Sequence, residues 1–169
     1  MAANNIYRTT WQKPFINGKF NPKLIVSSSI KVGGCYLIKD RNDKIVYVGY
    51  SETNIYKTLT RHFQKWKDIS RTHQTRFYYD RELFTVKIYF CHYILAAILE
   101  KYFIQKHDPK DNKHKYEEIN FNKIKLNKIS SLLFSATVIY YADELPNIKT
   151  RPKNKNTRPT ADTINEVPF

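Results

Sequence analysis

Two short pieces of the chain each combine a tyrosine with a glycine: Tyr36 follows Gly34 by two residues, and Tyr47 precedes Gly49 by two. A phenol hydroxyl can donate and accept hydrogen bonds, so it can orient or activate a water molecule. Glycine within a strand often marks a close approach by another backbone or a ligand. A lone tyrosine in a strand would more often be ordinary core packing. The pairing with glycine favours a chemical site instead.

The tyrosines fall in two segments that predict the arms of one β-hairpin. Residues 33–39 and 44–50 are rich in β-branched and aromatic residues, and the polar residues 40–43 between them are typical of a turn. If the loop centres on Asn42 and Asp43, position 38 faces 47 and position 36 faces 49. Because successive side chains alternate between the faces of a strand, Tyr36 and Tyr47 should then share one face.

A helix is predicted over residues 54–66, where apolar side chains recur at helical spacing. Thr53 or Asn54 can cap its start. Its apolar stripe, flanked by Thr58 and His62, is formed by Ile55, Leu59, Phe63 and Trp66. The opposite side carries the basic residues Lys57, Arg61 and Lys65, which form either a solvated polar face or a surface for an anion.

Residues 83–90 predict a further strand, and residues 93–105 predict a mostly apolar helix in which Glu100 is the only acid. An isolated buried carboxylate is very costly. Glu100 should therefore lie at the edge of the buried surface, pair with a base, or hold a cation. The Asp- and Pro-containing segment 108–112 ends this helix.

The charge of the chain narrows the class of partner. Its 169 residues carry a net charge of +14, with an isoelectric point near 9.7. Such an excess favours a polyanion, above all nucleic acid. No run of apolar residues reaches the length of a membrane span, and no signal peptide is evident, which predicts a soluble, cytoplasmic protein. Cys35 and Cys91 are too few for a disulfide framework and lack metal-binding spacing.

The order of these pieces over residues 33–112 resembles the GIY-YIG nuclease domain: GCY, then YVG, a basic helix ending in RHF, a strand, and LEKYFIQKHDPKDN. The resemblance implies an α/β fold with a small three-stranded antiparallel sheet flanked by helices. It also implies hydrolysis of DNA phosphodiester bonds with one divalent metal ion, usually Mg²⁺, for which Mn²⁺ could substitute.

By this resemblance, Tyr36 would help to activate the attacking water and Tyr47 would be its partner. Gly34 and Gly49 would shape the hairpin beside the scissile phosphate. Glu100 would hold the metal. The downstream asparagine of the family corresponds to Asn112, which would support the site next to the substrate.

The chain departs from the family at the basic residue of the first helix. The family has an arginine eight residues after the second glycine, followed four residues later by histidine or tyrosine. Counting from the glycine gives Lys57, whereas counting back from His62 gives Thr58. We expect Arg61 to supply the cation with His62 as the family's histidine, and Lys57 is the second choice; Lys57 and Lys65 would also contact substrate.

Three regions are predicted: an N-terminal extension over residues 1–32, a GIY-YIG-like domain with a C-terminal strand over 33–145, and a flexible basic tail over 146–169. The extension is expected to cover the sheet or to form a DNA-contacting arm, and residues 137–141 predict the C-terminal strand. The function expected is a metal-dependent DNA endonuclease, with target choice aided by the flanks, a homodimer or a separate targeting protein. The alternatives are a noncatalytic nucleic-acid-binding module of the same fold and a basic interaction protein.

Overall fold

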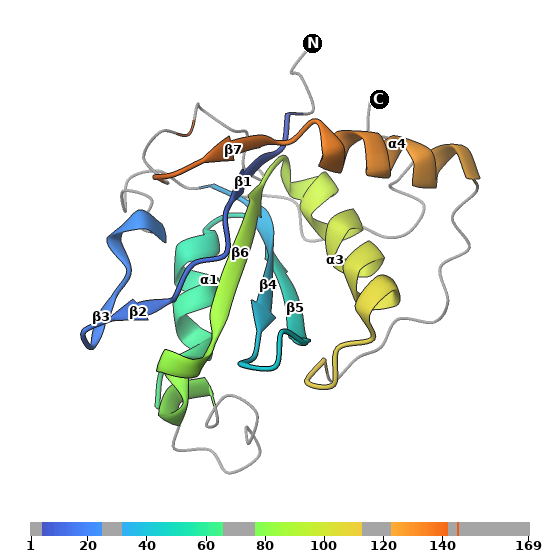
Figure 1. Ribbon diagram of the computed structural model, residues 1–169. Coiled ribbons are helices and arrows are strands. Elements are labelled where there is room, and N and C mark those ends of the chain that lie inside the picture. Colours follow the sequence, from blue (N-terminus) through green and yellow to red (C-terminus); the bar gives the residue numbers. More distant parts are fainter. Residues whose placement is uncertain (1–4, 25–31, 66–76, 113–122, 142–144, 146–169) are drawn as a thin grey trace.

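A mixed five-stranded sheet forms the centre of the computed structural model, which describes residues 5–24, 32–65, 77–112, 123–141 and 145 (Figure 1). The strands lie side by side in the order β5 (Ile45–Ser51), β4 (Gly34–Lys39), β6 (Thr85–Phe90), β1 (Tyr7–Thr9) and β7 (Thr137–Ile139). All neighbours are antiparallel except β1 and β7, which run parallel.

The predicted three-stranded sheet is therefore too small, because β1 and β7 extend it beyond β6. Tyr7 pairs with Phe90 of β6 on one side and with Thr137 of β7 on the other. Without β1, the backbone groups along that side of β6 would form an open edge, which proteins usually cover or pair. Part of the predicted N-terminal extension thus joins the main sheet edge to edge.

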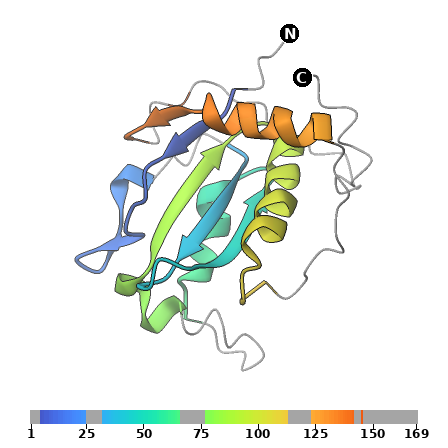
Figure 2. The same ribbon diagram turned by 45° about the vertical axis from the view of Figure 1, so that its right-hand side comes forward.

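Helices cover the two faces of the sheet differently (Figure 2). The helix α1 (Ile55–His62) lies behind the sheet in both views, while α3 (Tyr93–His107) lies in front of β4 and β5. The helix α4 (Lys123–Phe134) crosses one end of the sheet. Short elements complete the described chain: β2 (Phe15–Ile16), β3 (Lys19–Phe20), η1 (Pro22–Leu24) and η3 (Arg81–Leu83).

The helix ends follow local chemistry. The side chain of Asn54 accepts a hydrogen bond of 2.9 Å from the backbone N–H of Lys57, which confirms one of the two predicted caps of α1. This helix ends at His62 rather than continuing to Trp66, which lies outside the described residues. The predicted second helix starts at residue 93 as expected and ends where Asp108 takes a left-handed conformation, with φ of 43°.

Two buried layers result, one on each face of the sheet. The layer beneath α1 contains Tyr36, Ile38, Ile55 and Leu59, and the layer beneath α3 and α4 contains Cys35, Leu37, Val48 and Leu99. Alternation along β4 and β5 thus separates the two sets. Among the described residues, no helix is long and apolar enough to cross a membrane. The predicted basic tail over residues 146–169 lies outside the described residues.

Candidate active site

The hairpin of β4 and β5 brings Tyr36 and Tyr47 to the same face of the sheet. The register pairs Tyr36 with Gly49 and Ile38 with Tyr47, as the sequence predicted, and it shifts only between Ile38 and Lys39 near the turn. The two tyrosine rings are stacked, with centroids 6.2 Å apart and an angle of 28° between the planes. The shared face is therefore confirmed.

Gly49 leaves the space that the Tyr36 ring occupies. A Cβ atom at this position would overlap the hydroxyl oxygen of Tyr36 and would lie 2.6 Å from its Cζ and 2.9 Å from Cε1 of Tyr47. At Gly34, in contrast, the added Cβ would lie 2.5 Å from the backbone oxygen of Tyr89. Gly34 thus permits the close approach of β4 to β6, whereas Gly49 permits the position of the phenol.

His62 contacts both tyrosines from the last turn of α1. Its Nε2 lies 2.6 Å from the hydroxyl oxygen of Tyr36, which is a short hydrogen bond, and its ring centroid is 4.4 Å from that of Tyr47. The histidine is 5% exposed and Tyr36 is 1% exposed. The sequence placed His62 at the flank of the apolar stripe, but it contained no signal for a direct bond to Tyr36.

Glu100 lies on α3, is 8% exposed, and acts electrostatically on both tyrosines. Burial raises the pKa of Tyr36 well above its ordinary value, and the neighbouring Tyr47 and the Glu100 carboxylate raise it further. Burial, and then the charge of Glu100, raise the pKa of Tyr47 to about 12. Both phenols therefore hold their protons at neutral pH, and the charge of the Glu100 carboxylate contributes to this at both tyrosines.

The predicted cations occupy the outer part of α1. Lys57 and Arg61 are exposed on the helix, and Lys65 is exposed beyond its end. At 100° per residue, Arg61 projects about 100° from His62 around the axis, and Lys57 about 140°. Of the two, Arg61 therefore points in the direction closer to that of His62.

Thr58 stands four residues before His62, one turn earlier on the same side of α1. Its hydroxyl donates to the side-chain oxygen of Ser51, at 3.1 Å, and approaches the backbone oxygen of Asn54 at the same distance. The hydroxyl of Thr58 therefore makes a local contact, and no pattern in the sequence indicated that Ser51 at the end of β5 would take part.

Asn112 binds the outer edge of β5. Its Oδ1 accepts from the backbone N–H of Val48 at 3.0 Å, and its Nδ2 donates to the backbone oxygen of the same residue at 2.8 Å. The N–H of Asp111 donates to the backbone oxygen of Val46 at 2.9 Å. The side-chain amide of Asn112 thus forms hydrogen bonds with both backbone groups of Val48, at the edge of β5 next to Gly49. This is the role that the structure shows for Asn112.

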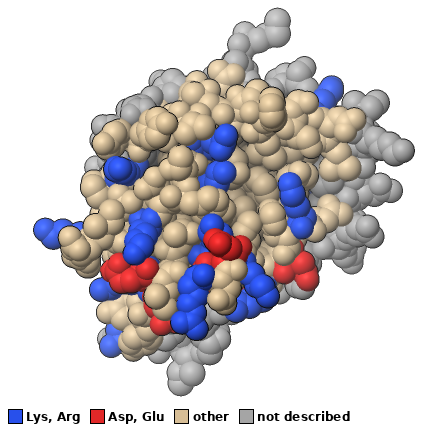
Figure 3. Space-filling view, viewed as in Figure 1, with Lys and Arg blue, Asp and Glu red and all other residues tan. Residues whose placement is uncertain are grey.

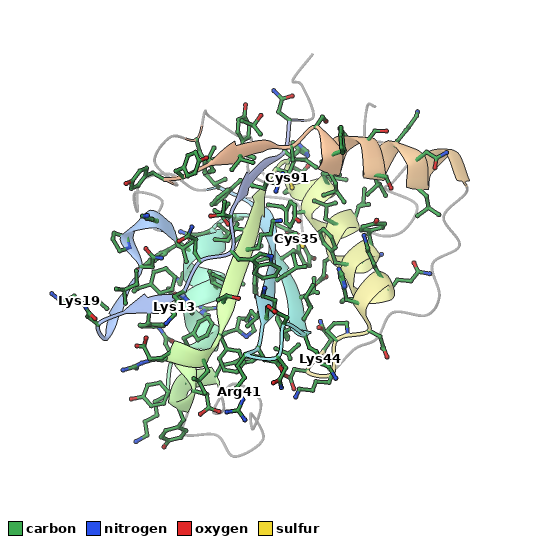
Figure 4. All side chains as sticks on the ribbon, viewed as in Figure 1. Lys13, Lys19, Cys35, Arg41, Lys44 and Cys91 are labelled. Carbon is green, nitrogen blue, oxygen red and sulfur yellow. The ribbon has the colours of Figure 1, made fainter. Side chains whose placement is uncertain are left out.

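The donors near the tyrosines suit only a sparsely bound cation. No group of three or more His, Cys, Asp or Glu side chains in the described ranges could enclose a metal ion. Magnesium, however, is commonly held by one or two carboxylates, with water and substrate phosphate completing its shell. Glu100, whose charge acts on both phenols, is a single carboxylate that fits such an ion. The cysteines do not belong to this set, because Cys35 and Cys91 are buried and free within the core (Figure 4).

The sequence model of the GIY-YIG catalytic domain matches residues 32–116, which is half of the chain and contains all the residues discussed above. A search of curated proteins found no match. The matched segment covers β4, β5, α1, β6 and α3, the elements that carry Tyr36, Tyr47, His62 and Glu100. Because the match spans half of the chain and the tyrosine hairpin has the register that the motif requires, the chain belongs to the GIY-YIG family of nuclease domains.

Proposed function

We propose that this protein is a DNA endonuclease that hydrolyses phosphodiester bonds with one magnesium ion. The observation that carries the proposal is the 2.6 Å contact between Tyr36 and His62, stacked against Tyr47 and under the charge of Glu100. A tyrosine and a histidine in hydrogen-bond contact can pass a proton between them, which is what general acid–base catalysis of hydrolysis uses.

Tyr36 and His62 act together on the proton of that water. Because the pKa of Tyr36 is raised, the phenol starts protonated and can donate its proton to Nε2 of His62 across the 2.6 Å contact. As water attacks phosphorus, its proton passes to the oxygen of Tyr36 while the phenol proton passes to Nε2 of His62. This exchange avoids a free phenolate, which burial and Glu100 would disfavour.

Tyr47 and Glu100 shape the surroundings of this pair. Tyr47 stacks on Tyr36 and restricts the direction of its hydroxyl. Glu100 would hold the metal ion, which when bound supplies positive charge to the phosphate oxygens. Nucleases of the family typically use a divalent metal, and the hard oxygen donors here favour Mg²⁺, with Mn²⁺ as a substitute.

Arg61 is proposed as the second positive charge at the phosphate. Counted back from His62, the position of the family's arginine falls on Thr58, and Arg61 lies about one turn further on with a longer reach than the hydroxyl. Lys57 is the alternative, although a lysine offers no bidentate fork to a phosphate. Lys65 and the net charge of +14 would hold the rest of the DNA backbone.

Target choice is proposed to come from outside the hairpin, through the flanking segments, a second copy, or a separate targeting protein. The noncatalytic alternative rests on one specific observation, which is that neither Lys57 nor Thr58, the two candidates for the position of the family's arginine, is an arginine. In that case the fold would bind nucleic acid without cleaving it.

The experiment is incubation of supercoiled, linear, single-stranded and branched DNA with the protein and MgCl₂, beside Glu100→Ala and Tyr36→Phe. We expect cleavage by the native protein and losses of at least ~100-fold for each variant, the usual scale for an essential acid–base group. Cleavage that survives both substitutions unchanged would show that the site is wrong. Binding without cleavage under Mg²⁺ and Mn²⁺ would favour the noncatalytic alternative.

A further inference from the structure

A second group of basic side chains lies on the opposite face of the sheet from Tyr36. The register pairs Lys87 of β6 with Leu37 and pairs Arg8 of β1 with Tyr89, so both cations share the face on which α3 packs. Lys39 of β4 lies on the same face, two residues beyond Leu37. Strand pairing thus gathers three cations from distant parts of the sequence.

An indole ring lies close to two of these cations. The Nζ atom of Lys39 is 4.4 Å from the ring centroid of Trp11, and that of Lys87 is 5.8 Å from it. Lys87 is also 5.5 Å from the ring centroid of Tyr89. Aromatic faces attract cations, which explains how the lysines remain close to one another. We call Arg8, Trp11, Lys39 and Lys87 the sheet-face cluster.

The sheet-face cluster lacks matching negative charge. Within the part of the chain that the structure describes, neither Arg8 nor Lys87 forms an ion pair, and Lys39 pairs only with the exposed Asp43, at 2.7 Å. Burial lowers the pKa of Lys87, and the charges of Arg8 and Lys39 lower it further. Like charges held together in this way are costly unless an anion offsets them.

Two buried polar atoms beside these cations also lack partners. The Nε atom of Arg8 and the hydroxyl oxygen of Thr85 make no hydrogen bond among the described residues. Thr85 pairs with Lys39 across the β4–β6 ladder, so its side chain belongs to the same face. Such groups usually have a partner in the functional state, because an unsatisfied buried polar atom costs roughly 1–3 kcal/mol.

Figure 3 views this face and shows basic side chains over β1 and β6. The acidic side chains visible in the same view lie toward the end of the molecule that carries the β4–β5 turn. Positive charge, two unfilled hydrogen-bonding groups and an aromatic ring therefore occur together on one surface. These are the groups that bind the phosphates and bases of a nucleic-acid strand.

We infer that the sheet-face cluster binds the phosphodiester backbone of a nucleic-acid strand, at a place separate from the tyrosine site and on the other face of the sheet. Arg8 and Lys87 contact phosphate oxygens, Thr85 donates its hydroxyl, and Trp11 stacks on a base. The inference rests on the proposed function only in taking nucleic acid as the partner, and it does not require that the protein cleave it.

Binding is measured through Trp11 itself. The chain has two tryptophans, so Trp66→Phe leaves Trp11 as the sole indole fluorophore. In this background, single-stranded and duplex oligonucleotides of the same sequence are titrated in EDTA, which prevents metal-dependent cleavage. We expect quenching by at least one of the two forms, and the form that quenches identifies the strand that the cluster holds.

The cluster is then tested by Arg8→Gln/Lys87→Gln against the matched control Lys13→Gln/Lys19→Gln, which removes the same charge from exposed positions near β2 and β3 (Figure 4). The first pair should weaken binding at least ~10-fold and lower the salt dependence by about two phosphate contacts. The control should weaken it much less. The single variant Lys87→Arg keeps the positive charge, so it should retain most of the affinity of the native protein.

Equal losses in the two double variants, or no quenching of Trp11 by either oligonucleotide, would overturn the inference. Folding does not obscure the result, because removing mutually repelling charges should leave the melting temperature unchanged or raise it. The outcome is also separate from the proposed function. Cluster-dependent binding without cleavage supports the inference alone, whereas cleavage with equal losses in the two double variants supports the endonuclease alone.

Discussion

Gly49→Ala is the substitution that most sharply separates the site from the fold. The new Cβ would lie 2.6 Å from Cζ of Tyr36, where ordinary contact begins at 3.4 Å, so the phenol must move by roughly 1 Å. Tyr36 is 1% exposed and packed against Tyr47, which leaves little room for that movement. A shift of this size would stretch the 2.6 Å contact with His62 beyond hydrogen-bonding distance.

Two magnitudes follow from the displacement. Overpacking of a buried site typically costs about 1–3 kcal/mol of unfolding free energy, and Gly49→Ala should fall within this range. A misplacement of about 1 Å at a reacting group can cost on the order of 100-fold in rate. The variant should therefore remain folded while losing most of its cleavage activity.

Gly34→Ala is the matched control, because its Cβ would meet the backbone of β6, together with Cδ1 of Ile55 at 2.8 Å, rather than either tyrosine ring. The backbone oxygen of Tyr89 lies 2.5 Å away and Cα of Phe90 lies 3.2 Å away, so β4 and β6 would have to separate. Urea unfolding and single-turnover cleavage are measured for both variants, with rates expressed per folded molecule. We expect Gly34→Ala to lose more stability and Gly49→Ala to lose more activity. The reverse order, or native activity in Gly49→Ala, would refute the reasoning.

Three further predictions concern the edge strand and the buried phenols. Asn112→Ala removes both bonds to Val48 and should lower the unfolding free energy in urea by about 1–3 kcal/mol, with Asn112→Asp intermediate because it keeps the acceptor; equal stability of all three proteins would contradict this. Because Tyr47 and Tyr89 have pKa values of about 12 in the folded protein against 10 when exposed, the stability they contribute is complete below pH 10 and is lost as pH rises toward 12. Denaturation near pH 11 should show a loss of about 1 kcal/mol of unfolding free energy for each of the two tyrosines, and Tyr89→Phe should remove the part of this loss that Tyr89 causes. If the loss is unchanged in Tyr89→Phe, the prediction is wrong. Glu100→Gln removes the nearby negative charge, so absorbance titration near 295 nm should show a lower pKa for Tyr47, and an identical titration curve would place the carboxylate elsewhere.

The tyrosine face could be predicted from the sequence because it depends on local rules. Alternation along two strands joined by a short turn fixes which residues share a face, and the structure pairs Tyr36 with Gly49 as expected. The cap at Asn54 likewise depends on residues next to it in the chain. The start of α3 at residue 93 follows from a long apolar segment.

Features that depend on distant pairing could not be predicted in the same way. β1 spans only Tyr7–Thr9, too short for a periodic pattern, and its place beside β6 depends on contacts about 80 residues away. The sheet therefore has five strands rather than three. The sheet-face cluster has the same origin, since Arg8 and Lys87 meet only after β1 and β6 pair. Nor could the sequence reveal that Thr58 bonds to Ser51, which depends on how α1 leaves β5.

The central claim is that Tyr36 and His62 act as one proton-transferring unit, and a double-mutant cycle tests it most directly. Single-turnover cleavage with MgCl₂ is measured for the native protein, Tyr36→Phe, His62→Ala and the double variant. If the two groups share one proton transfer, the double variant should be about as slow as the slower single variant. Losses that multiply, or a native protein that binds DNA and leaves it intact, would contradict the claim.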